Sequence, residues 1–269
     1  MGTNSPKSFA LGRVIRRART QKRFSLKDLS RIIGRDTATM CRWEIGERIP
    51  ALDQLTYILG VLGVRGQALH YATGLARDPD NTSWLTTDPH DRLAQHDAYI
   101  DFEQRAREAT IVSPMLVPDL LHTPATAEAI AAAGGNRVTH RERSRILSGA
   151  QPVNLRVFLG APALNQHIGG TATAHEQLEH LAVVSRLPTV ELRVFGLGLG
   201  WHPGVDGSFS VLNAHNLRTA YVTGRQCSVW LHRSEDVERY EQDCRAIEER
   251  ALSPEESLAL ISETARRLR

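Results

Sequence analysis

The first 75 residues carry a repeating pattern of apolar and polar positions. Apolar side chains recur three to four residues apart, which is the period of a helix with one buried face. This spacing predicts helices over 9–22, 26–33, 37–45, 52–62 and 66–73. Ser25 and Asp36 are predicted N-caps of the second and third helices, and Gly34 ends the second. We therefore expect a small all-helical domain at the start of the chain.

The second and third predicted helices are joined by only two residues, a connection typical of a helix-turn-helix motif. At about 100° per residue, Met40 and Trp43 fall on one side of the third helix, which we expect to be core. The opposite side is free to enter a major groove. We expect Arg42 to bond guanine there, and Thr37 to contact a base edge or a phosphate.

Two further groups complete the predicted DNA-binding set. On the outer side of the third helix, Ala38 is expected to touch a thymine methyl group, and Cys41 lies beside it. Near helix ends and in the following turn, the predicted phosphate contacts are Ser25, Lys27, Arg35 and Arg48.

The charge of the chain is unevenly distributed. Residues 1–50 contain twelve Lys or Arg against four Asp or Glu, a net charge of +8, whereas the whole chain sums to only +3. A basic segment followed by an acidic remainder fits a DNA-binding module joined to a domain that does not bind DNA. A solvated arginine-rich helix is the alternative interpretation.

The segment LGRVIRRARTQKRFSLKDLSRIIGRDTATMCRWEIGERIPALDQLTYILGVLGV resembles the Cro/C1-type, xenobiotic-response-element-like helix-turn-helix domains. CRWEIGERIP matches the end of the family's recognition helix and the loop after it. The resemblance implies that Arg19 and Glu44 form a buried ion pair between helices. Leu26 departs from the family, because many relatives carry at that position a Gln that bonds a phosphate.

The composition and periodicity of residues 76–269 predict a linker and a second domain. Residues 76–90 are rich in Asp, Thr and Pro and lack periodicity, so the predicted division is 1–75, a linker at 76–90 and a domain at 91–269. Predicted helices cover 92–110, 119–133, 139–148, 174–186, 234–251 and 253–268. Predicted strands cover 154–159, 190–196, 208–212, 219–222 and 228–232. The first two strands flank a helix, which favours a parallel βαβ unit, and the last three favour antiparallel pairing. The expected fold is a five-helix domain followed by an α+β domain with a mixed sheet covered by helices.

Residues 92–268 resemble the uncharacterised domain that follows helix-turn-helix modules in actinobacterial antitoxin-like transcriptional regulators. The likeness rests on FEQRAREATIVSPMLVPDLLHTPATAEAI, GGTATAHEQLEHLAVVSRLPTVELRVFGL, GVDGSFSVL and LSPEESLALI. It implies control by a small partner protein encoded by a neighbouring gene. His122 replaces the usual Gln of the family's LLQTP pattern, and we expect specificity to differ if that position contacts a ligand.

Few residues suggest other chemistry. The histidines show no HExxH or other tight ligand spacing, and no catalytic spacing of carboxylates or serines is recognisable, so we expect no metal, no cofactor and no enzymatic activity. The glycine-rich segment 196–204 does not have the context of a dinucleotide site. It carries Trp201 and His202, which with His122 form the candidate effector or partner site.

These observations favour a cytoplasmic transcriptional regulator that binds double-stranded DNA as a homodimer and responds to a ligand or a small partner protein. No apolar run is long enough to cross a membrane. The alternative is an antitoxin-like interaction module that neutralises a small neighbouring protein and binds DNA for autoregulation. An enzyme carried by a DNA-targeting module is a third hypothesis, selected by no sequence feature.

Overall fold

The computed structural model describes residues 5–77, 81–135, 145–149, 151–196, 198, 200–214, 216–224 and 226–268. The chain divides into two compact units. The first consists of Met1–Asp101 with Arg225–Arg233, and the second of Phe102–Gly224 with Ser234–Arg269. The first unit is therefore built from two separate stretches of sequence.

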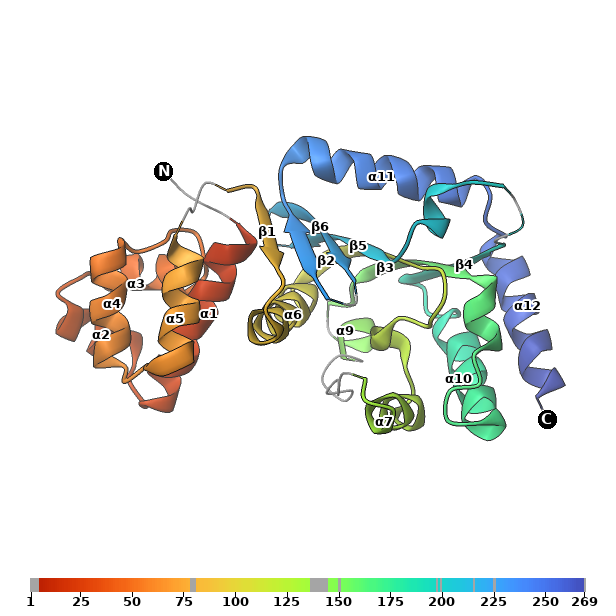
Figure 1. The fold of residues 1–269 in the computed structure, drawn as a ribbon, viewed down its shortest axis with the longest axis horizontal. Coiled ribbons are helices and arrows are strands. Elements are labelled where there is room, and N and C mark those ends of the chain that lie inside the picture. The colour runs from red at the N-terminus through yellow and green to blue at the C-terminus, as the bar shows by residue number, and fades with distance from the viewer. Residues whose placement is uncertain are drawn as a thin grey trace. The chain divides into compact units, whose positions relative to one another are not determined.

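Five helices form in the first unit where the apolar spacing predicted them (Figure 1). They are α1 (Pro6–Gln21), α2 (Leu26–Ile33), α3 (Thr37–Glu44), α4 (Leu52–Val61) and α5 (Gly66–Ala76). Helix α1 packs against α3, α4 and α5. Fully buried side chains fill the space between the helices, among them Leu11, Ile15, Leu29, Met40 and Ile58. Helix α1 begins earlier than predicted, because Ser5 caps it in a reciprocal pair with Ser8 and Pro6 occupies its first position.

The same unit contains a short antiparallel strand pair and all but the last two residues of helix α6 (Pro89–Glu103). Strand β1 (Ser83–Thr86) lies within the predicted linker and pairs with β7 (Ser228–Leu231). Trp84 is buried and stacks on Trp230, with ring centroids 5.9 Å apart. Within the predicted linker, Ser83–Thr86 thus form a strand because they pair with residues about 140 positions away in sequence, which no local pattern reveals.

The second unit is built on a mixed sheet. Its strands are β2 (Ala106–Ser113), β3 (Asn154–Gly160), β4 (Val190–Phe195), β5 (Phe209–Ala214) and β6 (Leu217–Thr223), in the order β6-β5-β2-β3-β4. Strands β2, β3 and β4 are parallel, whereas β5 is antiparallel to both β2 and β6. The mixed sheet and the parallel β3–β4 pair confirm the prediction. The helix predicted over 92–110 is wrong in its last part: α6 ends at Glu103, and β2 begins at Ala106 as a central strand of the sheet.

Helices cover both faces of this sheet (Figure 1). Helix α11 (Ser234–Glu248) lies along one face, where the apolar core includes Val112, Phe158 and Ile247. Helices α7 (Pro124–Ala132) and α10 (Thr171–Val184) lie on the other side, and α12 (Pro254–Arg267) packs on α10 and β4. Short 3-10 turns occupy Asp119–Leu121, Ala161–Asn165 and Pro203–Val205.

Two predicted helices differ from the structure. The helix expected over 119–133 is broken, because Thr123 caps α7 and Pro124 occupies its first position. Of the helix expected over 139–148, only α9 (Arg145–Ser148) falls within the described residues, and 139–144 lie outside them.

No helix among the described residues has the length and apolar character required to cross a membrane.

Candidate nucleic-acid interface

Helix α3, the predicted recognition helix, is fixed to α1 by close backbone contact. A Cβ atom on Gly12 would lie 2.5 Å from the carbonyl oxygen of Trp43, so only glycine allows α1 to approach the end of α3 this closely. Gly46, just after α3, has a φ of +80°, and a Cβ there would lie 2.7 Å from the Cα of Phe9. The hydroxyl of Ser8 donates to the carbonyl of Gly46 at 2.6 Å. These contacts position both the helix and the turn that follows it.

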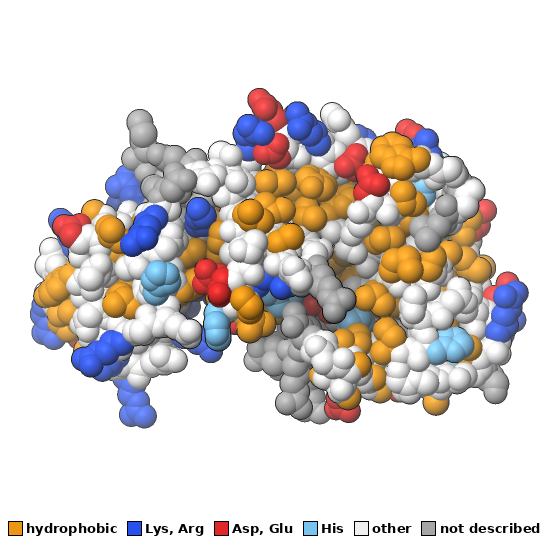
Figure 2. Space-filling view, in the orientation of Figure 1, with side chains coloured by type: hydrophobic (Ala, Val, Ile, Leu, Met, Phe, Trp, Pro, Cys, Tyr) orange, Lys and Arg blue, Asp and Glu red, His pale blue; other side chains and the backbone are white. Residues whose placement is uncertain are grey.

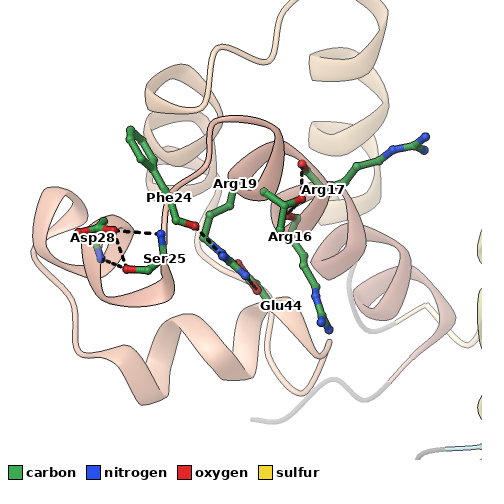
Figure 3. Close-up of polar contacts among 8 residues, drawn as sticks. Arg16, Arg17, Arg19, Phe24, Ser25, Asp28 and Glu44 are labelled. Carbon is green, nitrogen blue, oxygen red and sulfur yellow. Dashed lines mark hydrogen bonds and ion pairs between the residues drawn. The ribbon is translucent and has the colours of Figure 1, made fainter.

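Arg19 and Glu44 form the buried ion pair that the family resemblance implied (Figure 3). The two side chains are only 11% and 4% exposed. Arg19 Nε donates to Glu44 Oε1 at 2.5 Å, and Nη2 donates to Oε2 at 2.8 Å. Its Nη1 donates to the carbonyl of Phe24 at 2.7 Å, so one guanidinium joins α1, the start of α2 and the end of α3. The hydrogen bond with Glu44 raises the pKa of Arg19 above its ordinary value.

Side-chain caps begin both helices of the predicted motif. The Ser25 hydroxyl accepts from the Asp28 amide at 3.1 Å and donates to Asp28 Oδ2 at 2.6 Å, and the Ser25 amide donates to the same oxygen (Figure 3). Asp36 accepts from the amide and the hydroxyl of Thr39, both at 2.7 Å. Hydrogen bonds from Ser25 and Thr39 lower the pKa of Asp28 and Asp36, respectively. Ser25 is thus occupied as a cap, and a phosphate would have to compete with Asp28 for it.

The two sides of α3 differ in burial as its period predicted. Met40 and Trp43 are buried in the helical core. Thr37, Ala38 and Arg42 are exposed on the outer side. The helix therefore presents the predicted readout residues to solvent.

Other members of the predicted set lie close to this outer side. Cys41 is half-buried. The Thr37 hydroxyl lies 3.3 Å from that of Ser30, so it already has a partner on α2. The carbonyl of Arg42 accepts from the amides of Glu47 and Arg48, which folds the turn after α3 back onto the helix and leaves Arg48 exposed beside it. Arg48 is thereby held near Arg42 by the backbone.

Further exposed basic side chains lie on α2 and in the turn before α3. Lys27 and Arg35 are exposed at the start of α2 and in the turn before α3. With its amide oxygen turned toward Arg35, Gln54 of α4 accepts from Arg35 Nε at 2.6 Å. Blue side chains recur over the N-terminal helices on the face seen in Figure 2. The predicted DNA-binding set omitted Arg31 of α2, which is 81% exposed. The helical period puts Arg31 on the side opposite the apolar Leu29 and Ile33, and this signal could have identified it as an outward residue.

His122, in the second unit, lines a small pocket that holds about 20 Å³, room for about one water molecule. The pocket lies between the turns that follow β2 and β3 and the start of α10. His122 is buried, with Nε2 2.8 Å from the carbonyl of Val117. Gln177 joins α10 to this region, because it accepts from the Thr123 amide and donates to the Leu121 carbonyl, each at 2.8 Å. The neighbourhood of His122 is closely hydrogen-bonded.

Trp201 and His202 do not line the His122 pocket among the described residues. Trp201 is 72% exposed and approaches Asp206, with Nε1 3.4 Å from Oδ1. His202 is buried against Phe195 in an edge-to-face contact, with Nε2 3.2 Å from the Gly196 carbonyl. Adjacent residues thus differ completely in exposure, and the structure does not gather the three candidates into one site. Within the described part of the chain, no group of three or more His, Cys, Asp or Glu is arranged to hold a metal.

A family model with the description "Domain of unknown function (DUF5753)" matches residues 96–263, from within α6 to within α12. None of the curated proteins matches the chain.

Proposed function

Because the chain belongs to the DUF5753 family and joins that domain to five N-terminal helices, we propose that it is a sequence-specific DNA-binding transcriptional regulator. Its activity would be set by a ligand or a small partner protein bound to the C-terminal domain. The proposal includes a cytoplasmic location and no enzymatic activity.

The observation that carries this proposal is the outer surface of α3. Under this proposal, α1–α5 belong to the Cro/C1-type helix-turn-helix class, and α3 is the recognition helix. Support comes from a rigid attachment to α1 through the Arg19–Glu44 pair, combined with exposed Arg42 on the free side. A rigid helix with a cation at the groove-facing position suits direct reading of base edges.

The mode of binding is proposed to be dimeric. Two copies would place their α3 helices in successive major grooves about 34 Å apart on a pseudo-palindromic operator. Arg42, Thr37, Ala38 and Cys41 would face the bases. Lys27, Arg35 and Arg48, together with the Ser25 region, would face phosphates.

Genomic footprint sequencing of the tagged full chain tests this function. We expect sharp peaks over a palindromic motif that weaken and lose their preference at one motif position in Arg42→Ala and stay unchanged in Arg239→Ala, which removes an exposed cation from α11. Absence of peaks for the unaltered chain would refute the proposal.

The same experiment, repeated with the product of the adjacent gene co-expressed, separates two modes of control. Peaks that vanish on co-expression support a partner-controlled, antitoxin-like regulator. Peaks that are indifferent to it support a regulator that responds to a small molecule.

A further inference from the structure

The sheet face beneath α11 is divided into an apolar part and a polar part. Strand register places apolar residues side by side across four strands: Val222, Phe209, Val112 and Phe158. These residues pack in the core against α11. Side chains alternate along a strand, so the residues four positions away lie on the same face. There the register places a polar row instead: Arg218, Asn213, Glu108 and Asn154.

A cleft of about 410 Å³ opens over this polar row. Glu241 and Cys244 of α11 form part of its wall, and Glu108, Asn154, Arg156 and Arg218 come from the sheet. The volume falls within the usual range of about 300 to 1,000 Å³ for small-molecule sites. Most such sites are predominantly apolar, so the charged lining of this cleft selects for a polar ligand.

The arginines of the cleft already have carboxylate partners. Arg218 Nε donates to Glu241 Oε1 at 3.0 Å. Arg156 Nη1 lies 3.5 Å from Glu248 Oε2. An anionic ligand would have to displace α11 carboxylates from these arginines.

Glu108 differs from the other carboxylates that line the cleft. Glu191 is paired with Arg193, with Nε 2.5 Å from Oε1, and Glu241 is paired with Arg218. Among the described residues, Glu108 has only the neutral amide of Asn213, whose Nδ2 donates to Oε2 at 3.1 Å. Within the described part of the chain, the cleft therefore contains one carboxylate without a cationic partner, placed in the row between two asparagines.

We propose that this cleft binds a small organic cation whose ammonium or guanidinium group pairs with Glu108. The N–H groups of such a ligand donate to the carboxylate, and the side-chain oxygens of Asn154 and Asn213 supply further acceptors in the same row. The inference rests on the proposed function and names its effector class: the ligand that sets the activity of the regulator is an amine or a guanidine.

Isothermal titration of the full chain with 1,4-diaminobutane and 4-aminobutylguanidine tests the cleft without DNA. Succinate and 1,4-butanediol serve as anionic and neutral probes of similar length. We expect saturable binding of at least one cationic probe, weakened roughly tenfold or more in Glu108→Gln because a charge-assisted hydrogen bond is lost. Glu238→Gln, which removes the same charge from an exposed position of α11, is expected to leave the affinity unchanged.

Three results would overturn the inference: no saturable binding of either cation, equal affinity in Glu108→Gln, or equally tight binding of succinate. The titration is independent of the footprinting experiment. Footprint peaks without cation binding would remove the inference and leave the proposed function standing. Cation binding without peaks would leave the binding site standing but would remove the proposed function and, with it, the effector role of the ligand.

Discussion

The two compact units place arginine and glutamate in opposite ways. In the N-terminal helices a buried ion pair joins Arg19 and Glu44, and exposed Arg42 and Arg48 form no ion pair among the described residues. In the cleft on the sheet, Arg156 and Arg218 are paired with carboxylates of α11, and Glu108 has no cationic partner among the described residues. A surface of unpaired cations suits an extended polyanion, because each contact releases a counterion from the nucleic acid. A cleft with matched pairs and one remaining carboxylate suits a small cation. Under the two proposals, the same residue types would bind different ligands, because an exposed arginine without a carboxylate attracts an anion and a glutamate without an arginine attracts a cation.

The largest expected effect comes from breaking the inner pair. Glu44→Ala leaves Arg19 buried without its carboxylate and is expected to lower the free energy of unfolding of the first unit by about 3 to 5 kcal/mol. Hydrogen exchange of the α3 amides measures this loss. Glu241→Ala, which removes the partner of the half-exposed Arg218, is expected to cost the second unit about 0 to 1 kcal/mol. Equal costs at the two sites would contradict the contrast between inner and outer pairs.

Two glycine variants test whether packing against α1 constrains the turn after α3. Gly46→Ala combines a positive φ with a clash against the Phe9 backbone, and we expect a loss of about 2 to 4 kcal/mol. Gly34 also has a positive φ, of +70°, but has open space around the position of a Cβ. Gly34→Ala should therefore cost only about 1 to 2 kcal/mol. Chemical denaturation of each variant measures both values, and a ranking in the reverse order would show that α1 does not constrain this turn.

The exposed cations of α2 and α3 are tested on DNA. Arg42→Ala is expected to lose about 1 to 3 kcal/mol of binding free energy at one operator position and to relax sequence preference there. Lys27→Ala should weaken binding to all sequences similarly and lower the salt slope by roughly one unit. Affinity measured on an operator substitution series at several salt concentrations separates the two. A uniform loss in Arg42→Ala would remove it from the readout set.

The smallest expected effect is at the cap of α2. Ser25→Ala removes the hydroxyl that caps the helix and is expected to cost about 1 kcal/mol near neutral pH. The pKa of Asp28 is lowered in the folded state, so its stabilising contribution is present above its ordinary value of 3.8 and is lost as pH falls through the lowered value. Ser25→Ala moves this pKa back toward 3.8, so we expect a shallower acid dependence of stability, measured by denaturation between neutral and acid pH. An unchanged profile would contradict this account of the cap.

The helices of the first unit could be predicted from the sequence because the signals that define them are local. The helical period separates Met40 and Trp43 from Arg42, and the caps at Ser25 and Asp36 depend on residues only three positions away. The Arg19–Glu44 pair came from the family resemblance, and its geometry also requires the Phe24 carbonyl, which no pattern marks.

Non-local pairing explains what the sequence did not reveal. Ala106 and Ala109 fit a helical period, yet the segment is a strand because β3 and β5 pair with it on both sides. Glu108 becomes distinctive only once the register places it between Asn213 and Asn154. Similarly, Gly12 is unremarkable in the sequence until α3 lies against it.

Strand β7 makes the first unit impossible to obtain as one continuous fragment. A chain cut after Asp101 retains β1 but loses Arg225–Arg233, so Trp84 is left without Trp230 and β1 without its partner. Recombination that exchanges N-terminal segments between genes at a boundary near residue 90 would join a new β1 to a resident β7. Successful exchange therefore requires that both strands remain compatible, which ties the inheritance of the N-terminal helices to nine residues encoded far downstream.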